Sequence, residues 1–251
     1  MQKGTNINMA GHSKWNNIKR KKGVKDSARA KIFTKISREI LVCIRENGSA
    51  DPNVNGRLRD LIAKAKSNNI PNDNIDRLLK KALGGEKNDY ESCVYEGYGP
   101  GGVAVLVSSL TDNRNRTAGE MRHYFDKCGG NLGTSGCVSF MFSEKGVIVI
   151  DCEETPVSDY DVFMEHIIEV GADDYSESDG FIEVYTESMS NVAQIGEELR
   201  KKGYTVISAQ DEQIPANYTT LIDEEQIKKM NILLEMLEDN DDVQNVWHSW
   251  E

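Results

Sequence analysis

Residues 103–121, VAVLVSSLTDNRNRTAGEM, contain the two patterns on which the fold of this chain depends. The apolar run at 103–110 is typical of a buried strand. The polar stretch 111–117 ends that run, and Thr117 with Glu120 forms a possible capping box for a helix. One face of this helix would carry Ala118, Met121, Phe125 and Cys128. A strand followed at once by an amphipathic helix predicts helices packed on a sheet.

The same alternation continues toward the C-terminus. Strand patterns recur at 136–142, 146–151, 181–186, 204–209 and 243–250. Helical periodicity lies between them at 162–170, 192–199 and 227–237, and Asp223 caps the last of these helices. Strand–helix–strand units without long parallel-sheet runs predict two small α+β sandwiches.

Toward the N-terminus the pattern becomes purely helical. Asp26 and Ser27 cap a first amphipathic helix, Asp51-Pro52 starts a second, and a third ends at Gly84-Gly85. Short connections between three such helices predict a small bundle. The fold class is therefore α+β, with a three-helix bundle and a basic arm before two sandwich domains.

Charge is distributed very unevenly along the chain. The 251 residues carry a net charge of -11, from 30 Lys+Arg and 41 Asp+Glu. Residues 1–89 hold 20 of the cations and 9 of the anions, a net of +11, so the remainder holds 10 and 32, a net of -22. Such a split predicts a basic module for a polyanion, joined to acidic modules that could contact basic proteins.

The basic module contains the candidate nucleic-acid contacts. Cations neutralise phosphates, and a tryptophan offers a ring on which an unpaired base can stack. The alternative is a solvated helix face with a disordered basic tail, and the tryptophan packed on the bundle. The candidates are Lys14, Trp15, Lys19, Arg20, Lys21, Lys22, Lys25, Arg29, Lys31, Lys35 and Arg38.

A possible secondary anion site lies at the turn 111–117, TDNRNRT. The turn joins a strand to a helix start, where backbone amides and two arginines could hold an anion. Asparagine and aspartate are also common simply as turn and cap residues, and this structural role is favoured. The four residues concerned are Asn113, Arg114, Arg116 and Thr117.

Patterns for other chemistry are weak. The glycine-rich stretches 95–102 and 128–136 lack the phosphate-loop sequence and indicate turns, and 174–180 lacks the spacing of a calcium loop. The four histidines are isolated and the five cysteines scattered, which favours reduced thiols and predicts no metal or cofactor. No catalytic motif or small-molecule site is predicted. Neither a secretory signal nor a membrane span is evident, so we expect a cytoplasmic protein without a membrane partner.

Several motifs together resemble one family. MAGHSKWNNIKRKKG at 9–23, YEGYGPGGVAVLV at 95–107, GGNLGTSG at 129–136 and DDVQNVWHSW at 241–250 are similar to segments of the YebC/PmpR family, in the same order. The resemblance implies three domains, with the third inserted into the second. The corresponding boundaries are 1–8 for a disordered extension, 9–89 for the helical domain, 90–144 with 212–251 for the second, and 145–211 for the insertion.

The resemblance also implies a regulator of gene expression, by one of two mechanisms. Members are usually described as probable DNA-binding transcriptional regulators. Mitochondrial relatives are described as translational activators, and bacterial members have been linked to ribosomes. The residues leave both hypotheses open: the basic three-helix module suits DNA, whereas a basic arm with one tryptophan suits structured RNA. The expected partner is thus DNA or ribosomal RNA, with the ribosome or basic proteins as possible further partners.

Overall fold

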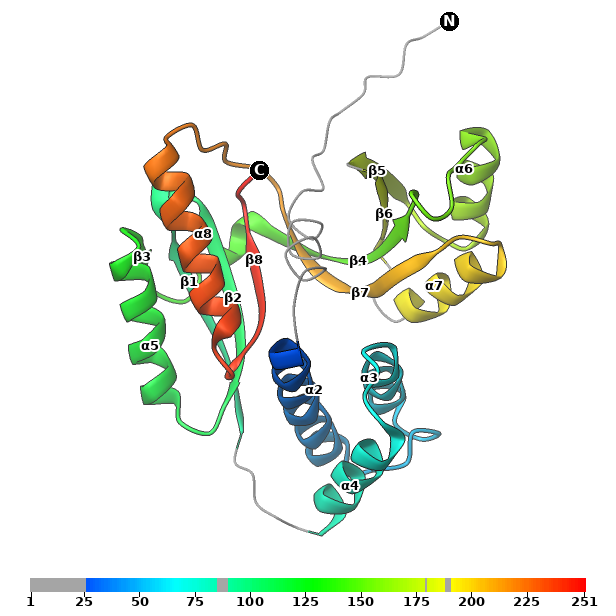
Figure 1. Ribbon diagram of the computed structural model, residues 1–251, viewed down its shortest axis with the longest axis horizontal. Coiled ribbons are helices and arrows are strands. Elements are labelled where there is room, and N and C mark those ends of the chain that lie inside the picture. Colours follow the sequence, from blue (N-terminus) through cyan, green and yellow to red (C-terminus); the bar gives the residue numbers. More distant parts are fainter. Residues whose placement is uncertain (1–25, 85–89, 179, 188–190) are drawn as a thin grey trace, which may run out of the picture. The chain divides into compact units, whose positions relative to one another are not determined.

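The computed structural model describes residues 26–84, 90–178, 180–187 and 191–251 (Figure 1). The chain forms two compact units. One contains the described residues up to Ser139 together with Leu221–His248, and the other contains Phe140–Thr220 with the last three residues. The fold is α+β, with a helical N-terminal part and two antiparallel sheets, as the sequence predicts.

Three helices form the N-terminal part of the first unit: α2 (Asp26–Asn47), α3 (Gly56–Ser67) and α4 (Asn72–Leu83). Their apolar stripes meet in one core, which includes Ile40, Leu58 and Ile75. The predicted start of the second helix at 51–52 is wrong. Helix α3 begins at Gly56 because the Asn55 side chain caps it, accepting a hydrogen bond from the Leu58 amide at 3.1 Å.

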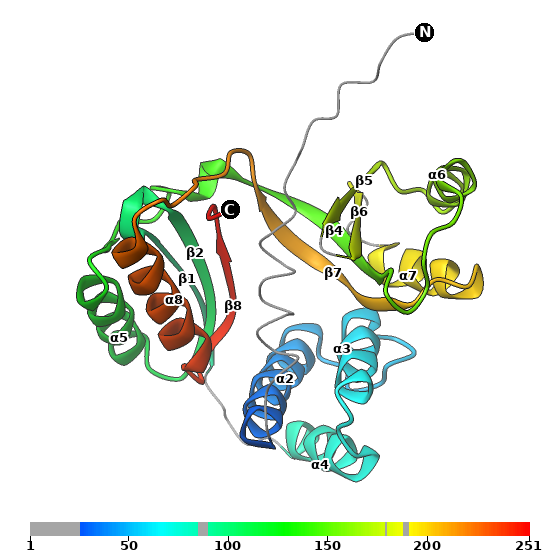
Figure 2. The same cartoon turned by 45° about the horizontal axis from the view of Figure 1, so that its top comes forward.

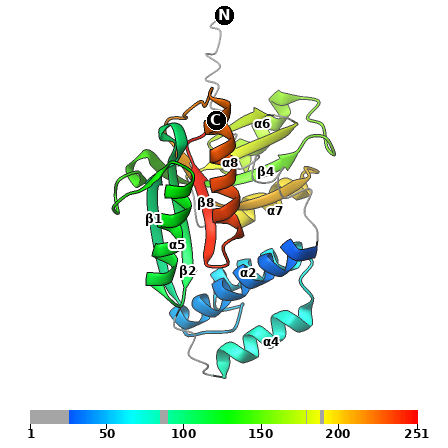
Figure 3. The same ribbon diagram turned by 60° about the vertical axis from the view of Figure 1, so that its left-hand side comes forward.

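The first unit also contains a four-stranded antiparallel sheet in the order β3-β1-β2-β8. Its strands are β1 (Glu91–Tyr98), β2 (Ala104–Thr111), β3 (Asn131–Leu132) and β8 (Val243–His248). Helices α5 (Arg114–Lys127) and α8 (Glu224–Asp239) cover one face of this sheet (Figures 2 and 3). The side chain of Asp223 caps α8, as predicted, by accepting from the Glu225 amide at 2.9 Å.

Strand β1 was not predicted, because its glycine falls in a stretch that indicated a turn. Gly97 lies inside the strand, where a Cβ would come within 2.6 Å of the Asn131 carbonyl oxygen. The turn itself follows as η1 (Pro100–Gly102), with Gly101 at φ 67°. A Cβ at Gly101 would also meet the Leu221 side chain. Both the positive φ and the packing therefore require glycine at this position.

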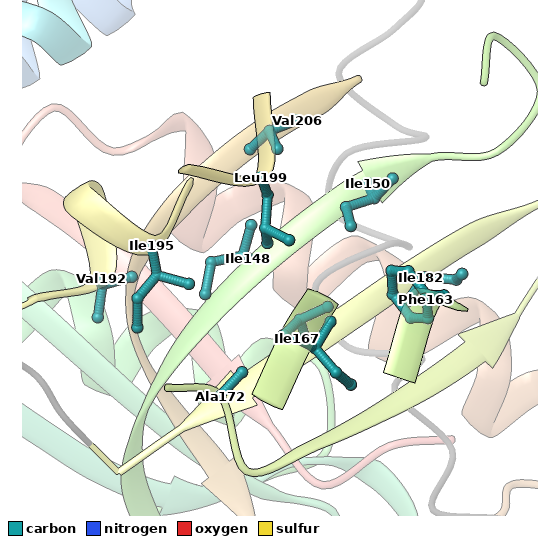
Figure 4. Close-up of a cluster of buried hydrophobic side chains, with 11 residues drawn as sticks. Ile148, Ile150, Phe163, Ile167, Ala172, Ile182, Val192, Ile195, Leu199 and Val206 are labelled. Carbon is teal, nitrogen blue, oxygen red and sulfur yellow. The ribbon is translucent and has the colours of Figure 1, made fainter. Parts of the chain in front are cut away.

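The second unit contains the other antiparallel sheet, in the order β5-β6-β4-β7. Its elements follow the chain as β4 (Phe142–Asp151), α6 (Tyr160–Glu169), β5 (Asp174–Ser178), β6 (Phe181–Thr186), α7 (Val192–Lys201) and β7 (Val206–Pro215). This order is the ferredoxin-like βαββαβ arrangement. The two helices and three of the strands enclose an apolar cluster, in which Ile148, Phe163 and Leu199 are fully buried (Figure 4).

The predicted strand at 136–142 is wrong for nearly all its length. A 3₁₀ helix, η2 (Ser139–Met141), lies there, and β4 begins only at Phe142. In a strand, the amides of this stretch would donate to a neighbouring strand. Here the amides of Gly136, Val138 and Ser139 donate to the carboxylate of buried Glu96, at 2.7, 2.9 and 2.7 Å. Conversely, β5 was missed at 174–178, because an edge strand tolerates polar residues on both faces.

The domain boundaries from the sequence stay a prediction. The hydrogen bonding between β4 and β7 bears on the two borders of the predicted insertion. The borders predicted at 144/145 and 211/212 fall inside β4 and β7. These two strands pair in an unbroken register from Phe142↔Pro215 to Val149↔Ser208. Both flanks of the predicted insertion therefore belong to its sheet.

Candidate nucleic-acid interface

The predicted basic face of α2 is present, and it is already in contact with acidic groups of the same unit. Lys31, Lys35 and Arg38 follow each other at helical spacing, so they lie on one side of α2. The Lys31 ammonium lies 2.7 Å from the Asp239 carboxylate, and Lys35 donates to the Glu238 carbonyl oxygen at 2.8 Å. Both acceptors belong to the last turn of α8. Unpaired carbonyls and the helix dipole make that end negative, which favours the lysines.

Arg38 makes the most extensive of these contacts. Its guanidinium donates to the Asp242 carboxylate at 2.6 Å and to the Asp241 carbonyl oxygen at 2.6 Å. It also reaches the Leu110 carbonyl oxygen at 3.3 Å and lies 5.2 Å from the centre of the Tyr90 ring. Only 16% of its side chain is exposed, so Arg38 is a partly buried joint between α2 and the sheet.

The turn 111–117 is built mainly by its own side chains. Helix α5 begins at Arg114, and Asn113 caps it by accepting from the Arg116 amide at 3.1 Å. The predicted capping box at Thr117 is therefore wrong by one helical turn. Thr117 is instead fully buried, and its hydroxyl donates to Asp242 at 2.7 Å. Sequence could not reveal this, because the acceptor lies far along the chain.

Asp242 brings the two predicted sites together. Besides Arg38 and Thr117, its carboxylate accepts from Arg116 at 2.7 Å and from the Thr111 hydroxyl at 3.0 Å. The residue is buried, and burial alone would raise the pKa of its carboxyl. The hydrogen bonds from the two arginines and two threonines outweigh burial, and hold the pKa of Asp242 below its usual range. The anion at the predicted secondary site is thus an internal carboxylate.

Asp242, Arg38 and Arg116 line an open polar cleft of about 350 Å³. Asp242 and Asp112 raise the pKa of Arg116 above its ordinary value through hydrogen bonds, so this arginine stays cationic. Arg114 is exposed and is not part of the lining; its carbonyl oxygen accepts from the Tyr95 hydroxyl at 3.4 Å. The cleft is lined by Arg38, Asp112, Arg116, Glu120, Asn240, Asp241 and Asp242.

The remaining predicted contacts cannot be placed. The backbone of Arg29 belongs to α2, but its side chain lies outside the described part of the structure. The other predicted contacts lie outside the described residues altogether: Lys14, Trp15, Lys19, Arg20, Lys21, Lys22 and Lys25.

Sequence reasoning missed Asp239 and Asp242 as partners of the basic residues. The acidic run 237–242, LEDNDD, begins where the predicted helical pattern at 227–237 ends. In the structure, α8 ends at Asp239 and Asn240 is its C-cap. The sequence did offer one signal, namely that the chain contains both an acidic run and a basic helix. Which cation meets which anion, however, depends on the tertiary fold.

Other sites in the described residues offer little chemistry. Burial raises the pKa of the Cys152 thiol to about 11, and also raises that of Cys128 and Cys137, which makes all three poor nucleophiles. Among the residues that the structure describes, no group of three or more His, Cys, Asp or Glu side chains is arranged to hold a metal ion.

None of the described helices has the length and apolar character needed to cross a membrane.

Comparison with known proteins identifies the family. The TACO1/YebC N-terminal domain matches residues 13–85, and the TACO1/YebC second and third domain matches residues 90–250. The chain belongs to the TACO1/YebC family. The resemblance drawn from the sequence motifs is thereby confirmed.

Relatives in this family align over nearly the whole chain. A probable transcriptional regulatory protein from Acetivibrio thermocellus is 52% identical over 243 residues, covering 96% of this chain and 99% of the relative. One of the same name from Ruminiclostridium cellulolyticum is 54% identical over 244 residues, covering 97% of each. The crystal structure of a conserved hypothetical protein from Aquifex aeolicus superposes with a TM-score of 0.79 at 43% identity, covering 90% of this chain and 91% of that one.

Proposed function

We propose that this TACO1/YebC-family protein is a non-enzymatic regulator of gene expression that binds nucleic acid through its N-terminal basic part. The observation that carries the proposal is the charge asymmetry, a net of +11 in residues 1–89 against -22 in the remainder. A polyanion is attracted to the first part and repelled by the second. The names of the relatives, probable transcriptional regulatory proteins, support a role in gene regulation.

The favoured target by family name is DNA. A basic helical domain is a common DNA-binding module, and a DNA-binding helix normally directs its N-terminal residues at base edges. Phosphate contacts from the arm and from α2 would position such a domain on a duplex without specifying sequence.

A second candidate target, ribosomal RNA, is favoured by one observation on α4. The first turns of this helix carry Asp73 and Asp76, which with Arg77 and Lys80 line a small polar hollow. Carboxylates at that end oppose insertion into a groove of DNA, whose backbone is anionic. Contacts to RNA through phosphates and stacked bases require no such recognition helix.

The direct test is the salt dependence of binding by the full chain. Labelled duplex DNA and a single-stranded RNA of about 20 nucleotides would be titrated in parallel by fluorescence anisotropy. With about five to eight phosphates contacted, log K should fall against log salt with a slope of roughly −4 to −7. Replacing Lys19, Arg20, Lys21 and Lys22 with alanine should make the slope shallower by about 3 to 4.

A charge-matched control variant separates specific contact from general attraction. Alanine at Lys201, Lys202, Lys228 and Lys229 removes the same charge from the end and C-cap of α7 and from α8, and should leave the slope unchanged. Equal slopes for all three proteins would show that the arm is not the binding surface. In cells, co-sedimentation with ribosomes that resists DNase and is lost with RNase would select the RNA target, and a DNase-sensitive complex would select DNA.

A further inference from the structure

We infer that the acidic end of α8, residues 238–242, is an internal competitor for nucleic acid, which occupies the basic face of α2 and is displaced when a polyanion binds. This inference rests on the proposed function, and concerns its regulation. In the structure, three predicted contacts, Lys31, Lys35 and Arg38, each bind a group of this segment. The part of the expected face formed by these three side chains is therefore occupied by the protein itself.

The segment 238–242 offers α2 the same kind of groups as a nucleic-acid backbone. It presents two carboxylates, from Asp239 and Asp242, and two carbonyl oxygens, from Glu238 and Asp241, all within 2.8 Å of a cationic nitrogen. Two of these four acceptor oxygens are anionic and two are neutral carbonyls. A phosphodiester chain likewise supplies successive acceptor oxygens, with one negative charge per phosphate, to a row of Lys and Arg side chains. The two ligands therefore compete for one surface.

The contacts between α2 and the segment 238–242 differ in how readily a polyanion can replace them. Both partners of the Lys31–Asp239 pair are exposed, with 39% and 66% of their side chains accessible. Such a pair is weak and screened by salt. The Arg38–Asp242 pair is largely buried and braced by Arg116 and two threonine hydroxyls. A polyanion should thus displace the segment from its exposed end, at Lys31, before it reaches Arg38.

Hydrogen exchange with mass spectrometry tests displacement in the unmodified full chain. The probe is a single-stranded RNA of about 20 nucleotides, at saturating concentration and low salt. Peptides that cover 238–243 should exchange at least about twice as fast in the complex, because their contacts with α2 are lost. A peptide that covers 146–151, in β4 of the other unit, should not change. Bound RNA without faster exchange at 238–243 overturns the inference and leaves the proposed function standing.

Variants test the competition independently. Asp239→Asn should tighten RNA binding by about two- to threefold, the effect of one exposed ion pair. Asp241→Asn is the matched control: it removes an equal charge from an exposed side chain that contributes only its backbone oxygen to Arg38. In a Lys31→Gln background, Asp239→Asn should have no effect, because the competing pair is already lost.

The outcomes separate the two claims. Equal effects of the two aspartate variants, or an Asp239→Asn effect that persists in the Lys31→Gln background, would show that only general charge changed, and the inference would fail. If neither RNA nor duplex DNA binds the unmodified chain at low salt, the proposed function fails, and the inference fails with it.

Discussion

Two four-stranded antiparallel sheets, each with two helices, are used differently in this protein. The sheet β5-β6-β4-β7 packs its helices through an apolar cluster, with Phe163 and Ile167 from α6 and Leu199 from α7. Its buried Asp151 carboxylate accepts from amides close in sequence, those of Glu153 and Glu154. The sheet β3-β1-β2-β8 places ionised carboxylates at its margins, Glu96 toward the loop 136–139 and Asp242 toward α2 and α5. Apolar burial is non-directional and stabilises a domain as a whole. A buried carboxylate selects particular donors, and here it fixes a loop and joins a helix to a sheet.

The largest expected effect lies in the apolar core of the sheet β5-β6-β4-β7. Phe163→Ala removes a fully buried ring and should lower the free energy of unfolding of residues 140–220 by about 3–5 kcal/mol. Native-state hydrogen exchange should place this loss in β4–β7 and not in β1, β2 or β8. Val162→Ala, on the same helix but 42% exposed, is the control and should change stability by less than about 0.5 kcal/mol. Similar losses in both sheets would mean that the two units unfold as one.

A smaller effect is expected at the charged joint. Asp242→Asn keeps the shape but removes the charge that binds Arg38 and Arg116, and should cost about 2–3 kcal/mol. Urea unfolding, followed by hydrogen exchange, should place the loss in α2, α5 and β8. Asp241→Asn, with the same charge change next to it in the chain, should cost much less. Equal costs would show that Asp242 acts only through net charge.

The smallest expected effect, and the one with a distinct pH dependence, lies at Glu96. Burial alone would raise the pKa of Glu96, but hydrogen bonds from Gly136, Val138 and Ser139 outweigh burial and lower it. The folded protein therefore binds fewer protons here than the unfolded chain. This stabilisation is complete above the unfolded glutamate pKa of about 4.3, and is lost as pH falls through the lower folded pKa.

Glu96→Gln cannot titrate, so it should cost about 1–2 kcal/mol at pH 7 and much less in acid. Urea unfolding from about pH 7 down to about pH 3 would measure the difference. Glu91→Gln, on an exposed position of the same strand, is the control and should follow the unmodified protein at every pH. A constant difference between Glu96→Gln and the unmodified protein across this range would contradict the role of the charge.

The sequence by itself determined the fold class, the helices and most of the strands, because periodicity and caps are local. The strand at 181–186 was predicted with its final limits, and α8 with its cap at Asp223. The sequence also showed the uneven distribution of charge and the family motifs, since both depend only on the order of residues in the chain. The predicted strand at 136–142 failed because its amides bind a carboxylate distant in sequence, that of Glu96. The helix starts predicted at 51–52 and at Thr117 failed for a local reason, because Asn55 and Asn113 cap those helices instead.

Only the tertiary structure decided what the cations of α2 and of the turn 111–117 contact. Lys31 and Asp239 are separated by 208 residues, and Arg38 and Asp242 by 204. Sequence gives the sign and spacing of such charges, but it does not give the approach of one segment to another. A row of cations that indicated a surface open to nucleic acid is, in the folded chain, a row of partners for its own acidic residues. The physical reason is that ion pairs form between groups that are close in space. Packing of the core determines which groups come close.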